Sequence, residues 1–486
     1  MVKKVSLIMA VLMVVSMLLM VSCDGDEPKT SGAENTGNDV PETIFGMSDW
    51  PERKMEEGTE LKVFGRASRK ADFVVDGLAD DPINDAVYNR NVWLKDTFGF
   101  EVTYHSEEND TVALESMTNI CKSGVDNFDL FVAGGTVISS LGRENYLLDM
   151  KTVENIDLTA EWWDQDANRD LSIANRVFFT SGALNTSAIA SVYCVFMNKD
   201  VLKKKGDYQD PYQLVRDNEW TIDKLLEISK DYVSDDGNGS WGKEDTYGYI
   251  GENYDSYALF FCSGERVVSK NAEDLPELVV DTPRAAEFVK KMKEFYSDNS
   301  VYIDLNATLV PMAQENRTLF RGALLNAIKT YRAMDADFGI LPLPKYEASQ
   351  ENYGHSISVA STGCLVGIPT CTANSEAAGF MVEMLAKSSL NTLYDAYLES
   401  TVKTRGLRDE ESYEMLEIIT NSLIYDVAYM NSWGTQHRTL GWMYYFYTIS
   451  GNPSLADNFS SEISKHKDST IIQINETIDV YKSYLE

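Results

Sequence analysis

The stretch Trp162-Trp163-Asp164-Gln165-Asp166 places two indoles and two carboxylates within five residues. Indole rings stack on the C–H faces of sugars, and carboxylates accept hydrogen bonds from sugar hydroxyls. We therefore interpret Trp162, Trp163 and Asp164 as candidate carbohydrate-binding residues. The alternative is that one or both tryptophans pack inside the fold.

A second group of aromatic residues lies in the segment 431–447, NSWGTQHRTLGWMYYFY. Trp433 lies between Ser432 and Gly434, which is typical of a loop residue that can stack on a ligand, whereas Trp442 is predicted to pack a helix. Three further residues are weaker candidates for ligand contact, with structural packing or a surface ion pair as the favoured alternative: Tyr193, Tyr257 and Arg332.

A short acidic loop resembles a calcium-binding loop. Asp236, Asn238 and Ser240 have the alternating spacing of oxygen ligands, but Trp241 stands where the EF-hand requires Gly and Tyr247 where it requires Glu. A solvated turn is therefore the preferred interpretation, and we predict neither a metal nor a cofactor.

The sequence contains no motif that specifies an enzyme. It has no GxSxG, HExxH or GxxxxGK[ST] pattern, and its four histidines show no metal-ligand spacing. We therefore predict no catalytic residues. Paired carboxylates for glycoside hydrolysis remain an alternative, because a chain with 76 acidic residues offers many such pairs.

The first 22 residues have the composition of a targeting segment, with Lys3 and Lys4 followed by an apolar run. The stretch Leu19-Met20-Val21-Ser22-Cys23 resembles a bacterial lipoprotein signal, in which the cysteine is lipidated and becomes the new N-terminus. An uncleaved membrane anchor is the alternative. Residues 23–59 are predicted to form the lipidated Cys23 and a flexible tether.

The net negative charge of the chain excludes some classes of binding partner. Removal of residues 1–22 leaves 41 basic and 76 acidic residues, a net charge of −35. Nucleic-acid binding depends on Lys and Arg that neutralise phosphates, so we expect no such partner. Attachment by basic contacts to an anionic membrane surface is equally disfavoured. The lipid on Cys23 would therefore have to anchor the protein.

Five cysteines follow Cys23: Cys121, Cys194, Cys262, Cys364 and Cys371. An odd number without a CxxC pair favours neither a disulfide framework nor a zinc site. We expect most of them to be small buried side chains, and a pairing of Cys364 with Cys371 stays open.

Strand and helix signals alternate in the first part of the folded chain. The predicted order is strand 61–65, helix 83–98, strand 100–104, helix 113–121 and strand 129–135. This order predicts a parallel, doubly wound sheet, in which ligands bind beyond the carboxyl ends of the strands. Gly134 and Gly135 lie at one such end. Their missing side chains would let a ligand approach the backbone, and the alternative is an ordinary turn.

Later helices have clear start signals. Thr282 is predicted to cap a helix with Pro283 at its first position, and Asn374 is predicted to cap another. Apolar residues at helical spacing between 471 and 485 predict a final amphipathic helix.

Several segments together resemble a known family, the extracellular solute-binding proteins of ABC importers, in its carbohydrate-binding family 1 group. They are residues 191–212 (SVYCVFMNKDVLKKKGDYQDPY), 219–249 (EWTIDKLLEISKDYVSDDGNGSWGKEDTYGY), 319–346 (LFRGALLNAIKTYRAMDADFGILPLPKY) and 363–386 (GCLVGIPTCTANSEAAGFMVEMLA). Residues 157–182 and 408–427 are similar to segments of large lipoprotein members from Firmicutes.

This resemblance implies a type II periplasmic-binding-protein-like α/β fold, with two lobes that each hold a mostly parallel sheet flanked by helices. Lobe 1 is expected over 60–188 plus 312–352, and lobe 2 over 189–311 plus 353–486 with a C-terminal helical extension. The implied protein is a monomeric sugar or oligosaccharide receptor at the outer face of the cell membrane, which serves ABC permease subunits. A surface glycoside hydrolase or a glycan-binding adhesin is the alternative.

Overall fold

The computed structural model describes residues 46–124, 128–331, 334–358, 363–403, 410–434 and 441–484. The chain divides into two units, Met1–Ser48 and Asp49–Glu486, and every described helix and strand belongs to the second unit. Cys23 and Arg332, which the sequence singles out, lie outside the described residues. None of the described helices is both long enough and apolar enough to cross a membrane.

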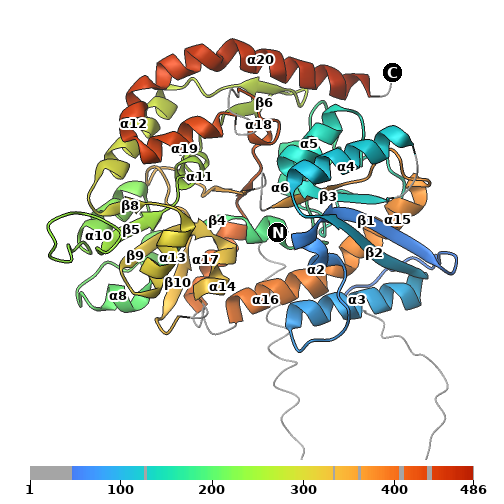
Figure 1. The fold of residues 1–486 in the computed structure, drawn as a ribbon, viewed down its shortest axis with the longest axis horizontal. Coiled ribbons are helices and arrows are strands. Elements are labelled where there is room, and N and C mark those ends of the chain that lie inside the picture. The colour runs from blue at the N-terminus through green and yellow to red at the C-terminus, as the bar shows by residue number, and fades with distance from the viewer. Residues whose placement is uncertain are drawn as a thin grey trace, which may run out of the picture. The chain divides into compact units, whose positions relative to one another are not determined.

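The first sheet has four strands in the order β12-β3-β1-β2. These strands are β1 (Thr59–Arg66), β2 (Phe100–Glu107), β3 (Leu130–Gly134) and β12 (Cys364–Gly367). β1 runs parallel to both β2 and β3, as the predicted βαβαβ order requires, and β12 joins the edge antiparallel to β3. We call this sheet, with the helices packed on it, lobe 1 (Figure 1).

The second sheet has five strands in the order β10-β4-β9-β5-β8 and forms the centre of lobe 2 (Figure 1). They are β4 (Tyr193–Asn198), β5 (Tyr247–Gly251), β8 (Val301–Ile303), β9 (Thr318–Leu324) and β10 (Phe338–Leu341). Two smaller ribbons pair β6 (Val268–Lys270) with β7 (Pro276–Leu278), and β11 (His355–Ser356) with β13 (Leu423–Ile424). The two helix-flanked sheets confirm the predicted α/β class.

Helices flank both sheets. In the first half of the chain they are α2 (Lys70–Phe73), α3 (Pro82–Phe98), α4 (Asp110–Ser123), α5 (Gly135–Arg143), α6 (Gln165–Leu171), α7 (Ser187–Ala190), α8 (Lys199–Lys203), α9 (Pro211–Arg216) and α10 (Ile222–Lys230). In the second half they are α11 (Asp255–Cys262), α12 (Pro283–Ser297), α13 (Asn306–Gln314), α14 (Ile328–Tyr331), α15 (Ser375–Ser389), α16 (Asp395–Lys403), α17 (Glu410–Thr420), α18 (Val427–Met430), α19 (Met443–Gly451) and α20 (Phe459–Ser483).

Local capping explains where the main helices begin. The Thr282 side chain accepts a hydrogen bond from the Ala285 amide with Pro283 at the first position of α12, and the Asn374 side chain accepts one from the Ala377 amide in α15. A side-chain acceptor satisfies one of the amide groups that the first turn leaves unpaired. Both predicted caps are confirmed.

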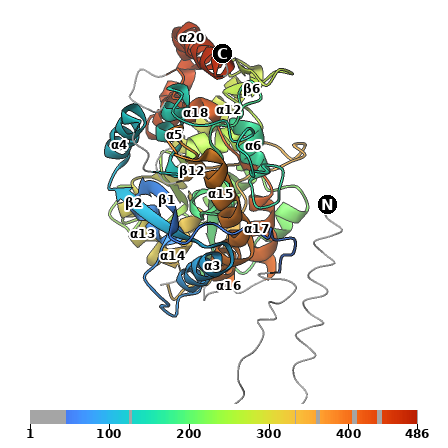
Figure 2. The same ribbon diagram turned by 90° about the vertical axis from the view of Figure 1, so that its right-hand side faces the viewer.

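Two later segments of the chain belong to the opposite lobe from the one that we predicted. Strands β9 and β10 lie in the segment 312–352, which we expected in lobe 1, yet they pair with β4 and β5 of lobe 2. Strand β12, expected in lobe 2, pairs with β3 of lobe 1. α15 follows β12 into lobe 1 and packs against α3 and β1 (Figure 2). The helical and strand periodicities were readable locally, but strand partners depend on contacts between distant segments.

Packed chain begins before residue 60, inside the segment that we predicted as a flexible tether. The Trp50 ring lies 4.6 Å from the Trp93 ring, and the Met55 amide donates to the Phe98 carbonyl at 2.7 Å. Arg53 forms an ion pair with Glu376 at the start of α15. An aromatic side chain near the end of a polar segment thus extends the folded chain by about ten residues, because it buries apolar area against α3.

The C-terminal helix α20 contacts both lobes. It packs on α5 of lobe 1 and on α12 and β7 of lobe 2. The Tyr481 ring lies 4.5 Å from the Phe178 ring, and the Arg176 Nε donates to the Tyr481 carbonyl at 2.6 Å. The extension that we assigned to lobe 2 therefore also forms part of the surface of lobe 1.

The described cysteines contain one close sulfur pair. The Sγ atoms of Cys121 and Cys371 are 3.6 Å apart, whereas Cys364 is fully buried in β12. Cys371 therefore faces Cys121 and not Cys364, the partner that the sequence analysis considered.

Candidate functional site

Trp162, Trp163 and Asp164 line a cavity of about 320 Å³. On one side it is lined by residues from lobe 1 in the segments 161–166 and 181–189. On the other side it is lined by Thr420, the last residue of α17, and by Asn421 and Leu423, which follow this helix; α17 packs on β10 of lobe 2. The cavity therefore lies between the two lobes, and interfaces between lobes are common places for ligand sites.

One carboxylate of α15 holds both indoles at the cavity wall. The Trp162 Nε1 donates to Glu383 Oε1 at 3.0 Å, and the Trp163 Nε1 donates to Glu383 Oε2 at 2.9 Å. Trp163 is only 2% exposed, so it packs into lobe 1, while Trp162 remains half-buried. The alternative of internal packing thus applies to Trp163, and both tryptophans line the cavity.

Burial dominates the electrostatics of Glu383. It raises the pKa of this carboxyl from 4.5 to about 7, although the two indole donors act in the opposite direction. The Lys387 ammonium lies 5.4 Å from the Trp162 ring centroid, which places a cation over that indole. The orientation of Trp162 is therefore set by a hydrogen bond and by a charge.

Gly182 allows Trp163 to approach the neighbouring backbone. A Cβ atom at this position would lie 2.7 Å from the Trp162 carbonyl oxygen and 2.9 Å from the Trp163 ring. Real Cβ atoms do not approach other heavy atoms this closely, so residue 182 has to be glycine for the observed indole arrangement.

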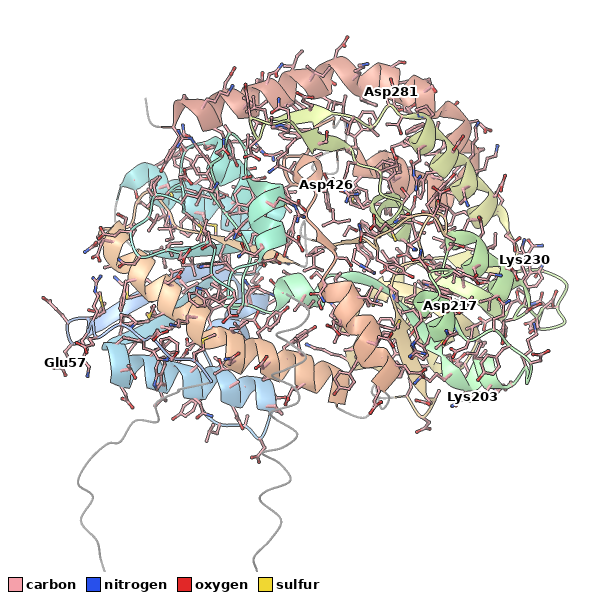
Figure 3. All side chains as sticks on the ribbon, turned by 180° about the vertical axis from the view of Figure 1, so that it is seen from behind. Glu57, Lys203, Asp217, Lys230, Asp281 and Asp426 are labelled. Atoms are coloured by element: carbon pink, nitrogen blue, oxygen red, sulfur yellow. The ribbon has the colours of Figure 1, made fainter. Side chains whose placement is uncertain are left out.

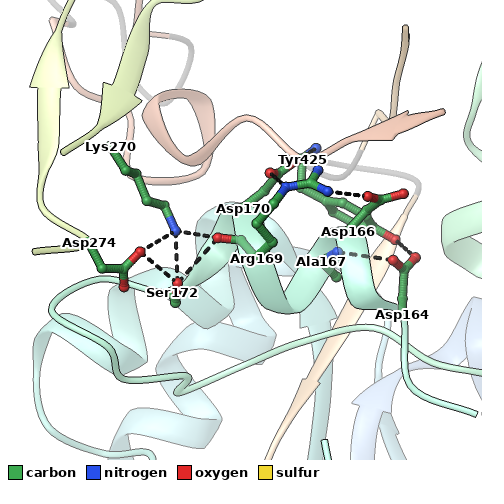
Figure 4. A network of polar contacts seen from close by, with 9 residues as sticks. All are labelled: Asp164, Asp166, Ala167, Arg169, Asp170, Ser172, Lys270, Asp274 and Tyr425. Carbon is green, nitrogen blue, oxygen red and sulfur yellow. Dashed lines mark hydrogen bonds and ion pairs between the residues drawn. The ribbon is translucent and has the colours of Figure 1, made fainter. Parts of the chain in front are cut away.

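Asp164 connects the cavity to neighbouring elements (Figure 4). Its carboxylate caps α6 by accepting from the Ala167 amide at 3.0 Å, and it accepts from the Tyr425 hydroxyl at 2.6 Å. Burial raises the pKa of Asp164. At the other end of α6, Lys270 and Asp274 of the β6–β7 ribbon contact Ser172, so both ends of α6 are held from outside lobe 1.

Asn185 contributes an unused donor. Its side chain is 1% exposed, and its Oδ1 accepts from the Ser187 amide at 3.1 Å. The Asn185 Nδ2 has no hydrogen-bond partner among the described residues, and Asn185 is one of the residues that line the cavity. A buried amide donor without a partner is costly, and a ligand oxygen in the cavity would satisfy it.

An irregular turn after α15 supplies the next part of the wall. Residues Leu390–Tyr394 form a π-helical segment in which Asn391 has non-helical angles, φ −97° and ψ 19°. Leu390 and Tyr394 from this segment line the cavity. Burial, and then the charge of Asp164, raise the pKa of Tyr394, so its phenol stays protonated and offers an O–H donor.

Three of the residues at the cavity were not predicted from the sequence: Glu383, Asn185 and Tyr394. Only Glu383 has a readable signal, because it is the one acidic residue in the apolar run Phe380–Leu385 of α15. A carboxylate in such a run needs buried donors. Nothing in the local sequence marks Asn185 or the π-helical turn as part of a site.

A second cavity, of about 680 Å³, continues from the first and shares Asp166, Asn421 and Leu423 with it. The Tyr353 hydroxyl lines this cavity and has no hydrogen-bond partner within the described parts of the chain. The space between the lobes is therefore longer than the indole pocket alone.

Four other predicted residues do not line the indole cavity. Gly134 ends β3 and Gly135 begins α5, and both are buried. Tyr193 is buried in β4, and the buried Tyr257 donates its hydroxyl to Asp426. Asp426, which is labelled in Figure 3, is itself buried. We therefore assign structural roles to these tyrosines.

Trp433 is not a loop residue that is open to a ligand, contrary to our prediction. It is 1% exposed, and its Nε1 donates to Thr477 of α20 at 3.1 Å. Trp442 packs against the same helix, with its Nε1 3.2 Å from Thr470 Oγ1. The small neighbours of Trp433 serve the tight turn around Ser432, whose φ is 55°.

The predicted calcium ligands Asp236, Asn238 and Ser240 hydrogen-bond to one another within the acidic loop. The acidic oxygens that lie within 4.8 Å of one another belong to Asp235, Asp236 and Asp245. Asn238 instead accepts from the Ser240 amide at 2.7 Å. These side chains hydrogen-bond to backbone amides of the loop, which agrees with a solvated turn.

Comparison with known proteins gives a fold match. No family model and no curated protein matches the sequence. An extracellular solute-binding protein from Staphylococcus aureus, solved in complex with maltose, has a TM-score of 0.58 and 12% identity over 89% of this chain and 100% of that chain.

Two further solved structures are similar. A cyclo/maltodextrin-binding protein in complex with maltotetraose has a TM-score of 0.56 and 14% identity, over 89% of this chain and 99% of that chain. The GacH receptor of Streptomyces glaucescens, solved unliganded and with acarbose, has a TM-score of 0.51 and 11% identity, over 88% and 99%. The chain therefore has the two-lobe α/β fold of these binding proteins.

Proposed function

We propose that this protein is an extracellular receptor of the solute-binding family, which captures a sugar or oligosaccharide between its lobes and delivers it to the permease of an ABC importer. The observation that carries the proposal is the cavity itself: it combines a half-buried indole, Trp162, with the unsatisfied buried donor of Asn185. An indole face and a paired polar group are the two contacts that a sugar ring needs.

The polar lining supports the same ligand class. Asp164, Asn185 and Asn421 provide acceptors and amide groups, and the Tyr394 phenol adds a donor. A long apolar ligand would leave these groups unpaired, at a cost of about 1–3 kcal/mol for each buried group. The solved structures with the same fold hold maltose, maltotetraose or acarbose, which makes short glucose-containing oligosaccharides the first ligands to test.

Binding in this arrangement requires no bond cleavage. A ligand that touches both lobes stabilises the closed form relative to the open one, because only the closed form makes both sets of contacts. A lipid on Cys23 would hold the receptor at the outer face of the membrane, and the following polar residues would let it reach the permease. The ATP would be used by the importer.

The direct test measures melting temperature and calorimetric binding of the purified chain, without residues 1–22, against maltose, maltotetraose and acarbose. A ligand at 100 times its Kd should raise stability by about 2.7 kcal/mol. Stoichiometric binding without new products supports a receptor. Release of shorter sugars would identify a glycoside hydrolase instead, and no saturable binding of any sugar would remove the carbohydrate assignment.

The matched variants are Asn185→Ala and Asn238→Ala. Asn185→Ala removes the buried donor and should weaken binding of the active sugar by roughly 10- to 100-fold. Asn238 lies in the exposed acidic loop, so its replacement should leave Kd unchanged. Equal affinities of both variants would show that the ligand binds elsewhere.

A further inference from the structure

Two thiols from distant parts of the chain meet on lobe 1. The Sγ atoms of Cys121 and Cys371 are 3.6 Å apart, although the residues are separated by 250 positions. Both cysteines are partly exposed, whereas Cys194, Cys262 and Cys364 are buried. Within the described residues, this pair therefore combines sulfur contact with access for a reagent.

The backbone around each thiol is held by the same scaffold. Cys121 lies in the last turn of α4, and Gly124 ends that helix in the left-handed region with φ 62°. On the other side, the Thr370 amide donates to the Tyr146 carbonyl at 2.9 Å, and the Thr372 hydroxyl donates to Asp129 at 2.8 Å.

Asp129 also accepts from the Lys62 amide at 3.0 Å, which fixes the Cys371 loop to β1. In addition, the Cys121 Sγ lies 3.9 Å from the Tyr146 carbonyl, the same group that accepts from Thr370. The Cys121 thiol and the backbone beside Cys371 thus meet at one carbonyl, and a disulfide requires the two sulfurs to move from 3.6 Å to the S–S bond length of about 2.0 Å.

We propose that Cys121 and Cys371 form a disulfide when the folded protein meets a small-molecule disulfide or a thiol–disulfide oxidoreductase. Outside the cell such oxidants are common, and partly exposed thiols in contact are their natural substrates. This disulfide is a covalent cross-link within lobe 1, and it is separate from the cavity that Trp162 lines.

The chemistry is two successive exchanges. The contact with Cys371, and then burial, raise the pKa of Cys121, so Cys121 remains a thiol at neutral pH. The Cys371 thiolate attacks one sulfur of the oxidant RSSR, which forms a mixed disulfide and releases RS⁻. Cys121 then loses its proton and attacks the Cys371 sulfur, and the second RS⁻ leaves. Two protein thiols are oxidised, and one RSSR is reduced to two RSH.

The position of the link gives it a structural consequence. Cys121 precedes the segment that builds lobe 2, and Cys371 follows β12, which returns the chain to lobe 1. The disulfide would close a loop that contains the whole lobe 2 sheet. A cross-link that closes a long loop lowers the conformational entropy of the unfolded chain. The disulfide should therefore raise the free energy of unfolding.

The test incubates the folded chain with oxidised glutathione, blocks remaining thiols, and maps peptides by mass spectrometry without reduction. We expect a peptide pair joined through Cys121 and Cys371, two hydrogens lighter than the separate peptides. The oxidised protein should melt several degrees above the reduced one. Cys371→Ser should abolish both the link and the rise in melting temperature, and Cys364→Ala should retain the link.

Three results would overturn the proposal. They are recovery of Cys121 and Cys371 as thiols, recovery of Cys371 with a glutathione adduct and no link, and a link between Cys371 and Cys364. Each is visible in the same peptide map, and none depends on whether the protein binds a sugar.

Discussion

Glu383 has two tasks at the cavity wall, because each of its oxygens accepts a hydrogen bond from a different indole. Replacement by Gln keeps one acceptor and turns an NH₂ donor toward the other indole N–H. We expect Glu383→Gln to lower the free energy of unfolding by about 1–3 kcal/mol and to weaken sugar binding by disordering Trp162. Urea unfolding and calorimetry measure the two effects, with exposed Glu219→Gln as the control.

The same residue should make stability depend on pH. Its pKa is 4.5 in the unfolded chain and about 7 in the folded chain. The protonated form is therefore favoured by folding, and the stability that it contributes is present below pH 4.5 and is lost as the pH rises through 7. Each unit of pKa difference corresponds to about 1.4 kcal/mol.

We expect the free energy of unfolding to fall between about pH 5 and pH 8 by up to about 3 kcal/mol more in the native sequence than in Glu383→Gln. Urea titrations at both pH values measure this difference. Identical pH slopes for the two proteins would show that Glu383 does not titrate in this range.

Gly182 provides a steric test of the indole arrangement. An alanine there would bring its Cβ within 2.7 Å of a backbone oxygen and 2.9 Å of the Trp163 ring. Because neither neighbour is a flexible side-chain end, Gly182→Ala should cost about 1–3 kcal/mol of stability and weaken sugar binding. Gly77→Ala, where no heavy atom lies within 4 Å, is the matched control. Equal melting temperatures would refute the packing argument.

At the scale of elements, α15 connects lobe 1 to the cavity. It carries Glu383 and Lys387, and it leads into the π-helical turn at Tyr394. Its start depends on Asn374, which accepts from the Ala377 amide at 3.1 Å. Asn374 does not line the cavity but caps the helix that orients the indoles.

We expect Asn374→Ala to lower the free energy of unfolding by about 1 kcal/mol, while Asn374→Asp keeps the acceptor and should retain most of the stability. Chemical unfolding of the three proteins gives the ranking. An alanine variant as stable as the native sequence would mean that packing alone positions the start of α15.

Elements were predictable where their signals are local. The caps at Thr282 and Asn374, strands β1, β2 and β3 of the first sheet and the helices between them follow from residues a few positions apart. The assignment of β9, β10 and β12 to lobes failed, because apolar strands of similar composition do not specify a partner in a distant part of the chain. The π-helical turn at 390–394 was also unpredictable, since it depends on how α15 and α16 pack.

The candidate site residues were likewise predictable only where their signal is local in the sequence. Trp162, Trp163 and Asp164 were predicted as a group because they are adjacent in sequence, and all three line one cavity. Trp433 was misassigned, because small neighbours indicate a turn but not whether α20 covers it. Asn185 was missed, because an unpaired donor is a property of its surroundings and not of its type.

At the scale of the whole molecule, anchoring and transport remain proposals with their own test. Cys23→Ser should release the protein into the medium or leave its precursor unprocessed, because serine provides no thiol for lipidation. Fractionation of cells and culture medium with an antibody measures this. Unchanged processing and anchoring would mean that the apolar segment before residue 23 is the real anchor.

The unequal burial of the tryptophans has an optical consequence. Trp163, Trp220, Trp433 and Trp442 are at most 3% exposed, whereas Trp162 is half-buried at the cavity wall beside a carboxylate and a cation. Ligand stacking would change the polarity and quenching around that one indole more than around the others. The protein should therefore report its own occupancy by a shift in ultraviolet fluorescence, and Trp162→Phe should silence that signal.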